Sequence, residues 1–404
     1  MSDVILRKAL GASIPPATRA PLASIGVNFA ALSVFATFFG PWLVGTLGAS
    51  AAVASTAYLV AGIAGVGGGY LGGRLTDRLG PRPVLLVGGG LQVAAIAVLL
   101  IPGIGVGVAC AVLVIMTFLQ PVRGVAQRIA LASSVPDEER DAVFSGYRLV
   151  VNLGSILGPL LGAGLVAVGW EALHAEVVAL YLLSFLLGRR VVAERPTPPA
   201  AQPAKRRGLF GDWRLYGLML ASTAAWTVVY GYETVLPIAL TEDYGMSPST
   251  WGLLYSLGPI LVVFLQLRIT RLLSTLPPGR PLVAGAVLMG ASFLVLLAVG
   301  SAPLAVLVAL VVLLIVVFVS GDMIWGPASE VVVLRVAPPD RRGAYVGVLT
   351  SSIWLGSALA PGIGLPLRAG FGNPALWGAF AGVGVLSAVL YVVTDRYANR
   401  EISR

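Results

Sequence analysis

The sequence predicts an all-α membrane protein of twelve transmembrane helices, arranged as two pseudo-symmetric six-helix bundles. Three observations predict this class: an extreme composition, long unbroken apolar runs, and an internal repeat. Of the 404 residues, 57% are apolar and only 11% are charged, whereas about a quarter of the residues in a soluble domain are charged. Such a chain has too little polar surface to cover a soluble core. A soluble enzyme, a disordered chain and a secreted disulfide scaffold are therefore excluded.

The apolar runs have the length that a lipid bilayer requires. Its hydrocarbon core is about 30 Å thick, so a helical span needs about 20 mostly apolar residues. A β-barrel would instead need short segments of alternating character. Glycine, proline and charged residues separate the runs, and the expected spans are 22–46, 51–73, 83–101, 104–130, 142–168, 172–188, 214–240, 250–274, 281–300, 303–333, 343–367 and 374–394.

A hydrophilic linker, residues 189–213, is rich in proline and basic residues and divides the chain into bundles at 1–188 and 214–404. With a cytoplasmic N-terminus, every Lys and Arg except Arg368 falls in the inner tails, inner loops or adjoining helix ends, as the positive-inside rule requires. Both termini are therefore expected in the cytoplasm. The basic residues are almost all arginine, which suggests a GC-rich bacterial genome and hence a multi-pass protein of the bacterial inner membrane. The net charge of +9 is explained by this bias and by the anionic lipid that it faces, so no nucleic-acid partner is expected.

The two halves repeat. Residues 136–162 align without a gap onto 338–364 at an offset of 202, and the region around Gly48 aligns with that around Gly245 at an offset of 197. Parallel six-helix repeats are typical of transporters that move their halves about a site at the membrane midplane.

The segment between the second and third spans, GGRLTDRLGPRP at 72–83, resembles the loop motif of the major facilitator superfamily. The matching residues are Gly73, Asp77, Arg78, Gly80 and Arg82. We expect Gly73 to permit close helix approach, Gly80 to form the turn, and Asp77 to accept bonds from helix-end N–H groups or from arginine. In the family this loop is thought to latch the halves in one conformation. The second half departs from the pattern at Ser274, so a latch there should be weaker.

The fifth span resembles the antiporter motif of drug:proton exporters in this superfamily. Its glycines share one helix face and Pro159 permits a bend, so another helix can approach closely. The matching residues are Gly154, Gly158, Pro159 and Gly162, with Ala163 where the motif often has another glycine. Generic tight packing is the alternative interpretation.

Acidic residues within the spans are the main functional candidates, because charges at mid-membrane are costly. Trp226, Tyr230 and Glu233 are spaced to share one face of the seventh span, and Asp322 lies in the tenth. In the family, helices 1, 4, 7 and 10 line the central cavity, so the resemblance places both acids there. We predict that Glu233 and Asp322 carry protons and bind cations; packed acids satisfied by tyrosine or backbone are the alternative.

The remaining polar candidates are weaker. Arg123 resembles the buried arginine on helix 4 of proton-driven exporters, but an arginine that snorkels to the interface fits equally well. Gln120 is the repeat partner of Asp322 and a plausible hydrogen-bonding group of the cavity, and Asn152 could serve the cavity or join two helices. We expect His174 to lie at a wet loop end rather than in a metal site.

The expected function is proton-coupled export of amphipathic or cationic small molecules. The chain has no Walker P-loop, no nucleophile arrangement and no zinc spacing, so we expect no enzyme, no cofactor and no metal. The proton gradient is the energy source, and the partners are substrate, protons and the lipid bilayer, with the protein acting as a monomer. The alternatives are a carrier of one metabolite, such as a sugar, amino acid or organic acid, and a transport-dead sensor or lipid-handling partner.

Overall fold

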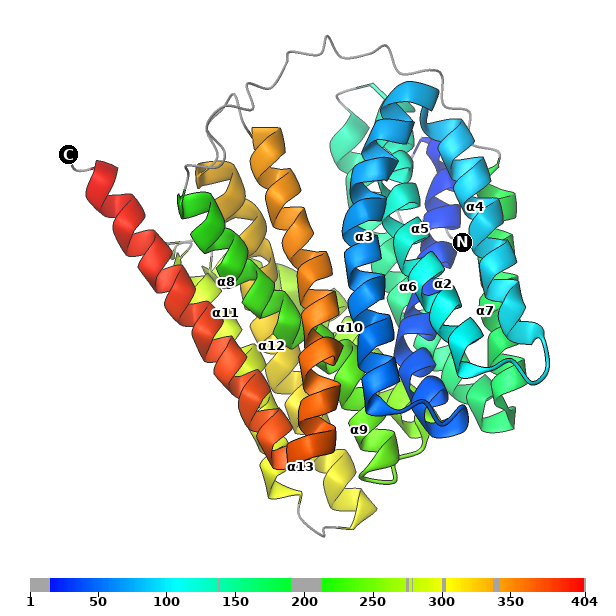
Figure 1. Cartoon of the computed structure of the whole chain (residues 1–404). Coiled ribbons are helices and arrows are strands. Elements are labelled where there is room, and N and C mark those ends of the chain that lie inside the picture. The colour runs from blue at the N-terminus through cyan, green and yellow to red at the C-terminus, as the bar shows by residue number, and fades with distance from the viewer. Residues whose placement is uncertain are drawn as a thin grey trace. The chain divides into compact units, whose positions relative to one another are not determined.

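The computed structural model describes residues 15–136, 139–189, 213–273, 276–277, 279–299, 303–336 and 342–402, and helices joined by short turns are their regular secondary structure. Figure 1 labels the elements. Their bounds are α2 Pro16–Pro41, η1 Trp42–Thr46, α3 Ala51–Leu79, α4 Pro81–Ala97, η2 Val98–Leu100, α5 Val106–Ser133, α6 Arg140–Val168, α7 Trp170–Gly188, α8 Trp213–Tyr230, η5 Gly231–Val235, α9 Leu236–Glu242, α10 Pro248–Leu273, α11 Gly279–Ser292, η6 Phe293–Ala298, α12 Leu304–Val336 and α13 Arg342–Ile402. The segments η1 and η5 are π-helical, and η2 and η6 are 3₁₀. Most of the predicted linker lies outside these residues.

Ten helices of the described chain are long and apolar enough to cross a membrane. All but one of them match one expected span each. The exception, Leu349–Thr394, covers most of one expected span, 343–367, and all of another, 374–394, with a break between them at Gly372, where φ is 78°. In Figure 1 the orange limb of α13 descends to this break and the red limb rises from it. The expected span 214–240 is not among the ten; it is formed by α8, η5 and α9 in succession.

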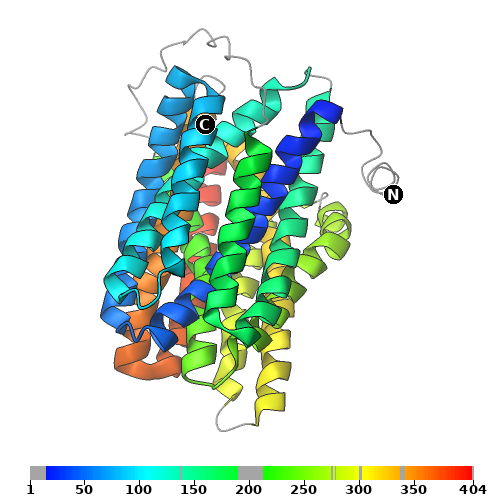
Figure 2. The same ribbon diagram turned by 90° about the vertical axis from the view of Figure 1, so that its right-hand side faces the viewer.

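The chain divides into two compact units. The first unit contains residues 1–49, 63–200 and 247–259, and the second contains 50–62, 201–246 and 260–404. In the first unit α2 packs against α6 and α7, and α4 packs against α5 and α7; Figure 2 shows the blue α2 beside green helices. In the second unit α8 packs along α13, and α11 packs against α12 and α13. Helix α3 is therefore divided: its start, up to residue 62, belongs to the second unit and its remainder to the first. Helix α10 is divided the other way, since its start, up to residue 259, belongs to the first unit and its remainder to the second.

The turns that follow η1 and α9 have the same backbone geometry. Gly48 and Gly245, which are repeat partners, have φ of 69° and 66°, a region that glycine adopts without a steric penalty. The next backbone N–H donates back to a helix carbonyl in both turns, from Ala49 to Leu43 at 3.1 Å and from Met246 to Leu240 at 2.9 Å. All of these residues are related by the offset of 197.

An ion pair joins α9 to α13 in the second unit. The guanidinium of Arg368 donates two hydrogen bonds of 2.6 Å to the carboxylate of Asp243. Next to it, Trp377 Nε1 donates to the Tyr244 hydroxyl at 3.0 Å, and burial raises the pKa of that hydroxyl. The basic residue that departs from the positive-inside pattern is therefore neutralised by an acid.

Candidate transport site

Glu233 lies in the π-helical segment η5, which interrupts the helical path of residues 213–242. Single π-helical turns are rare and are frequent at functional sites. The segment starts at Gly231, where a Cβ would lie 2.5 Å from the ring of Phe380, so only glycine fits this contact. The side chain of Glu233 is half-buried, and within the described residues no hydrogen bond or ion pair satisfies its carboxylate.

The second predicted acid, Asp322 on α12, is close enough to Glu233 for the two carboxylates to repel each other. Tyr232 lies near both acids, and its ring stacks on Phe318 with centroids 4.2 Å apart. Asp322 is also half-buried, and the described part of the chain contains no ion-pair partner for it. The structure thus brings the two acids near each other, with a buried tyrosine beside them. That both acids face a central cavity stays a prediction.

Aromatic rings adjoin the acids. The rings of Trp226 and Tyr230 lie 6.1 Å apart, and Trp226 meets Trp325 edge-to-face at 5.4 Å. Trp325 is 1% exposed, and its Nε1 donates a 3.1 Å hydrogen bond to the hydroxyl of Tyr391. The Tyr391 hydroxyl in turn hydrogen-bonds the Ser222 hydroxyl at 3.1 Å. Sequence reasoning missed Trp325, although its position one helical turn after Asp322 could have indicated it.

The first unit contains a chain of polar side chains instead of acids. Arg123 Nη1 donates to Gln92 Oε1, Gln92 Nε2 donates to Gln120 Oε1 at 3.1 Å, and Gln120 Nε2 donates to Asn28 Oδ1 at 3.4 Å. Arg123 is 3% exposed, so it does not snorkel to the interface. Gln92 and Asn28 were not predicted. Each is a polar residue within an apolar run, which is the signal that could have found them.

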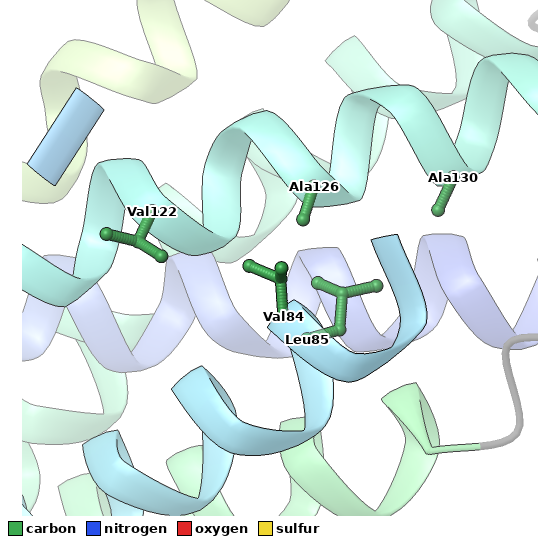
Figure 3. Packing of buried hydrophobic residues seen from close by; sticks show 5 residues of the cluster. All are labelled: Val84, Leu85, Val122, Ala126 and Ala130. Carbon is green, nitrogen blue, oxygen red and sulfur yellow. The ribbon is translucent and has the colours of Figure 1, made fainter. Parts of the chain in front are cut away.

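Small side chains fit α4 against α5 beside this chain of polar groups. Val84 and Leu85 of α4 pack against Val122, Ala126 and Ala130 of α5, and Figure 3 shows the five side chains. This contact brings α4 close to α5 next to the position from which Arg123 extends.

Two glycines of α4 provide the space for the Arg123 side chain. A Cβ at Gly88 would lie 3.0 Å from Arg123 Cγ. At Gly89 a Cβ would lie 2.9 Å from the Phe185 ring and 3.7 Å from Arg123 Cζ. Gly88 and Gly89 therefore leave room for the buried guanidinium.

The predictions for two other polar residues, Asn152 and His174, have different outcomes. Asn152 on α6 is half-buried and has no hydrogen bond within the described residues, so its role stays a prediction. The expectation for His174 was wrong: the side chain is 7% exposed and meets the Trp42 ring edge-to-face at 4.4 Å. No group of three or more metal-ligating side chains is present in the part of the chain that the structure describes.

The loop motif is mostly helical. Helix α3 continues to Leu79, so Asp77 and Arg78 lie in its last turn, exposed like Arg82. Gly80 forms the turn, with φ of 81°, as expected.

The role expected for Gly73 was wrong, because no described atom lies within 4 Å of the place its Cβ would occupy. Gly72 makes the close approach instead, with a Cβ position 2.6 Å from the Cα of Val122. The reason is helical phase: one residue rotates the direction of a side chain by about 100°. No ion pair of Asp77 is present among the described residues, and Ser274 lies outside them.

The glycines of the fifth expected span form a contact face. A Cβ at Gly154 would collide with the Gly26 carbonyl, and one at Gly158 would collide with the Ala30 carbonyl. Gly162 faces Phe38, with its Cβ position 2.9 Å from the ring. Helices α6 and α2 therefore approach to backbone contact, and Pro159 lies within α6 without ending it.

The second half repeats this contact at the same offsets. Gly154 faces the Cβ of Phe29, and its partner Gly356 faces the Cβ of Trp226 at 2.5 Å. These pairs are related by offsets of 202 and 197. The corresponding glycine in the second half thus holds α13 against the aromatic residue of the candidate site.

Comparison with known proteins agrees with this architecture. The family model of the Major Facilitator Superfamily matches residues 22–332. The chain is 24% identical over 298 residues to the multidrug resistance protein MdtH of Salmonella typhimurium, covering 72% of this chain and 71% of MdtH. It is 26% identical over 299 residues to MdtH of Enterobacter sp., with the same coverage.

Solved structures are similar over nearly the whole chain. The POT family transporter PepTSo matches with a TM-score of 0.79 at 15% identity, over 96% of this chain and 99% of that one. The nucleoside transporter NupG matches with a TM-score of 0.73 at 16% identity, over 93% of this chain and 100% of that one. At this identity the likeness concerns the fold alone. With its membrane-spanning helices, its recurring interhelical contacts and a family model that matches most of its length, the chain belongs to the major facilitator superfamily of membrane transporters.

Proposed function

We propose that the protein is a proton-coupled antiporter that exports amphipathic or cationic small molecules by alternating access. The observation that carries the proposal is the pair of half-buried carboxylates, Glu233 and Asp322, beside the rings of Trp226 and Tyr230. Similarity to two multidrug resistance proteins supports the substrate class.

Competition between protons and cations at the carboxylate pair would couple the two fluxes. Two ionised carboxylates that lie near each other repel, so a positive charge stabilises them. A cationic substrate supplies that charge and gains cation–π attraction from the faces of Trp226 and Tyr230. Protons arriving from the other side neutralise the acids, and the cation leaves. Each side chain thus binds either a proton or the substrate.

The proton gradient can supply the required energy without a cofactor. One charge that crosses 100 mV yields about 2.3 kcal/mol, and each pH unit adds about 1.4 kcal/mol. In the proposed arrangement twelve spans form two six-helix bundles, 1–188 and 214–404, with both termini on the cytoplasmic side of a bacterial inner membrane. The protein acts as a monomer.

The proposal is tested by flux of a lipophilic fluorescent cation in proteoliposomes under an imposed pH gradient. For one proton per cation and no membrane potential, one pH unit should sustain about a tenfold concentration ratio of the dye. Glu233→Gln and Asp322→Asn should each lower this ratio toward one, because an amide cannot carry a proton. Glu242→Gln is the matched control, since Glu242 is exposed at the end of the same helical path and its variant should behave like wild type.

A dye flux that does not depend on the pH gradient, in wild type and in both variants, would contradict the antiporter.

The second candidate, a carrier of one polar metabolite, is favoured by the amide groups of Asn28, Gln92 and Gln120 in the first unit. That carrier should transport a hydrogen-bonding solute and leave the dye behind. Ligand binding without any flux would indicate the transport-dead sensor.

A further inference from the structure

The guanidinium of Arg123 lies inside the first unit without a counter-charge. It is 3% exposed, and its hydrogen bond goes to a neutral amide, Gln92. Within the described residues no carboxylate pairs with it. An unpaired charge in a protein interior is strongly destabilising, and arginine does not lose its proton at physiological pH. A negative partner is therefore required.

The polar chain around Arg123 also has more donors than acceptors. The side-chain oxygens of Gln92, Gln120 and Asn28 each already accept one hydrogen bond along the chain. Three buried donor groups have no partner among the described residues: Arg123 Nε, Asn28 Nδ2 and the hydroxyl of Tyr181. Tyr181 lies close enough to Arg123 for an electrostatic interaction. Surplus donors with a net positive charge favour an acceptor that carries negative charge.

A small cavity adjoins Arg123, which is the member of the polar chain that lines it. It lies between α2, α4, α5 and α7, and its volume is about 20 Å³, enough for one particle of the size of a water molecule. Arg123 and Gln127 line it together with the ring of Phe185 and the backbone of Gly188. None of the described residues that line it is acidic. Gly88 and Gly89 hold the arginine side chain at this place.

We infer that Arg123 binds a small monovalent anion of the size of chloride in this cavity, with Gln127 as a second donor. The single guanidinium matches a single negative charge, and the cavity has room for a small ion. This site lies entirely in the first unit, whereas Glu233 and Asp322 belong to the second, so the inference stands apart from the proposed proton and substrate site.

Binding of radioactive chloride to the full chain, in nanodiscs of neutral phosphatidylcholine, tests the inference. Wild type should bind chloride saturably, and bromide should displace it while gluconate should not. Arg123→Gln should weaken binding by about 30-fold or more, the effect of removing one partner of a buried charge pair. Arg128→Gln is the matched control, because Arg128 is exposed on the same helix and its loss changes the charge equally. Equal binding by Arg123→Gln and wild type would overturn the assignment.

A second measurement uses wild type alone and so does not depend on the folding of a variant. The thermal unfolding midpoint is measured at constant ionic strength while chloride replaces gluconate. The midpoint should rise and then level off with chloride and with bromide, since a ligand that binds only the folded state stabilises it. An unfolding midpoint that is the same in chloride and gluconate would overturn the site.

Discussion

The two repeats of this transporter share glycine contacts and turn geometry, but their buried or half-buried polar side chains carry opposite charges. In the first, a buried arginine donates a hydrogen bond to a neutral amide; in the second, two carboxylates lie beside aromatic rings. The clearest contrast is between Gln120 and Asp322, which occupy equivalent positions at the offset of 202. One is a link in a hydrogen-bond chain and the other is an acid without a hydrogen-bond partner among the described residues. The two repeats thus have the same backbone contacts but different side-chain chemistry at equivalent positions such as 120 and 322.

The largest effect is expected from breaking the repeated glycine contact in each half. Gly154→Ala and Gly356→Ala should each lower the free energy of unfolding by about 1–3 kcal/mol, because the added methyl group meets backbone atoms. Gly356→Ala should also impair dye transport, because the methyl group pushes on Trp226. Thermal unfolding in detergent and the dye assay measure the two consequences. Gly164→Ala is the control, since no described atom lies within 4 Å of its Cβ position; equal losses in all three variants would refute the contact.

An intermediate effect is expected from removing the hydrogen bond between Trp325, which packs against Trp226, and Tyr391. Trp325→Phe keeps an aromatic ring but removes the Nε1 donor to Tyr391. Loss of this buried bond should cost about 1 kcal/mol of stability and weaken dye binding by less than the loss of an acid. Combining it with Tyr391→Phe should cost less than the sum of the two single variants, because both remove the same hydrogen bond, while Tyr391→Phe also removes the bond to Ser222. A double variant that is as unstable as the sum of the single variants would argue against the bond.

The smallest effect is expected at the ion pair of Asp243 and Arg368. A double-mutant cycle with Asp243→Asn and Arg368→Gln should give a coupling energy of about 0.2–1 kcal/mol, because exposed pairs are screened by solvent. The coupling should fall further as salt is added. Chemical unfolding at low and high salt measures it, and a coupling that is independent of salt would show that the pair acts through packing.

Much of the fold could be predicted from the sequence, because apolar length and repeats are properties of the chain alone. The left-handed turns at Gly48 and Gly245 agree with the repeat. Glu233 and Asp322 were expected to face one central cavity, which stays a prediction. The π-helical segment around Glu233 was not foreseen, because it depends on packing against Phe380.

The polar chain of the first unit was foreseen only in part. Arg123 and Gln120 were candidates, but their partners come from two other helices and become visible only in three dimensions. Likewise, the choice between Gly72 and Gly73 for the helix contact depends on the rotation of α3, which a glycine-rich sequence does not specify.

The π-helical interruption has a consequence for the synthesis of the protein. Residues 213–242 are not among the helices that qualify as membrane spans by length and apolarity, and a charged residue at mid-helix costs about 2.5–3.5 kcal/mol during insertion. This segment leaves the ribosome before α12 and α13, which supply its packing partners Phe318, Trp325 and Phe380. We therefore expect it to wait in a partly inserted state until the last two helical elements have been made.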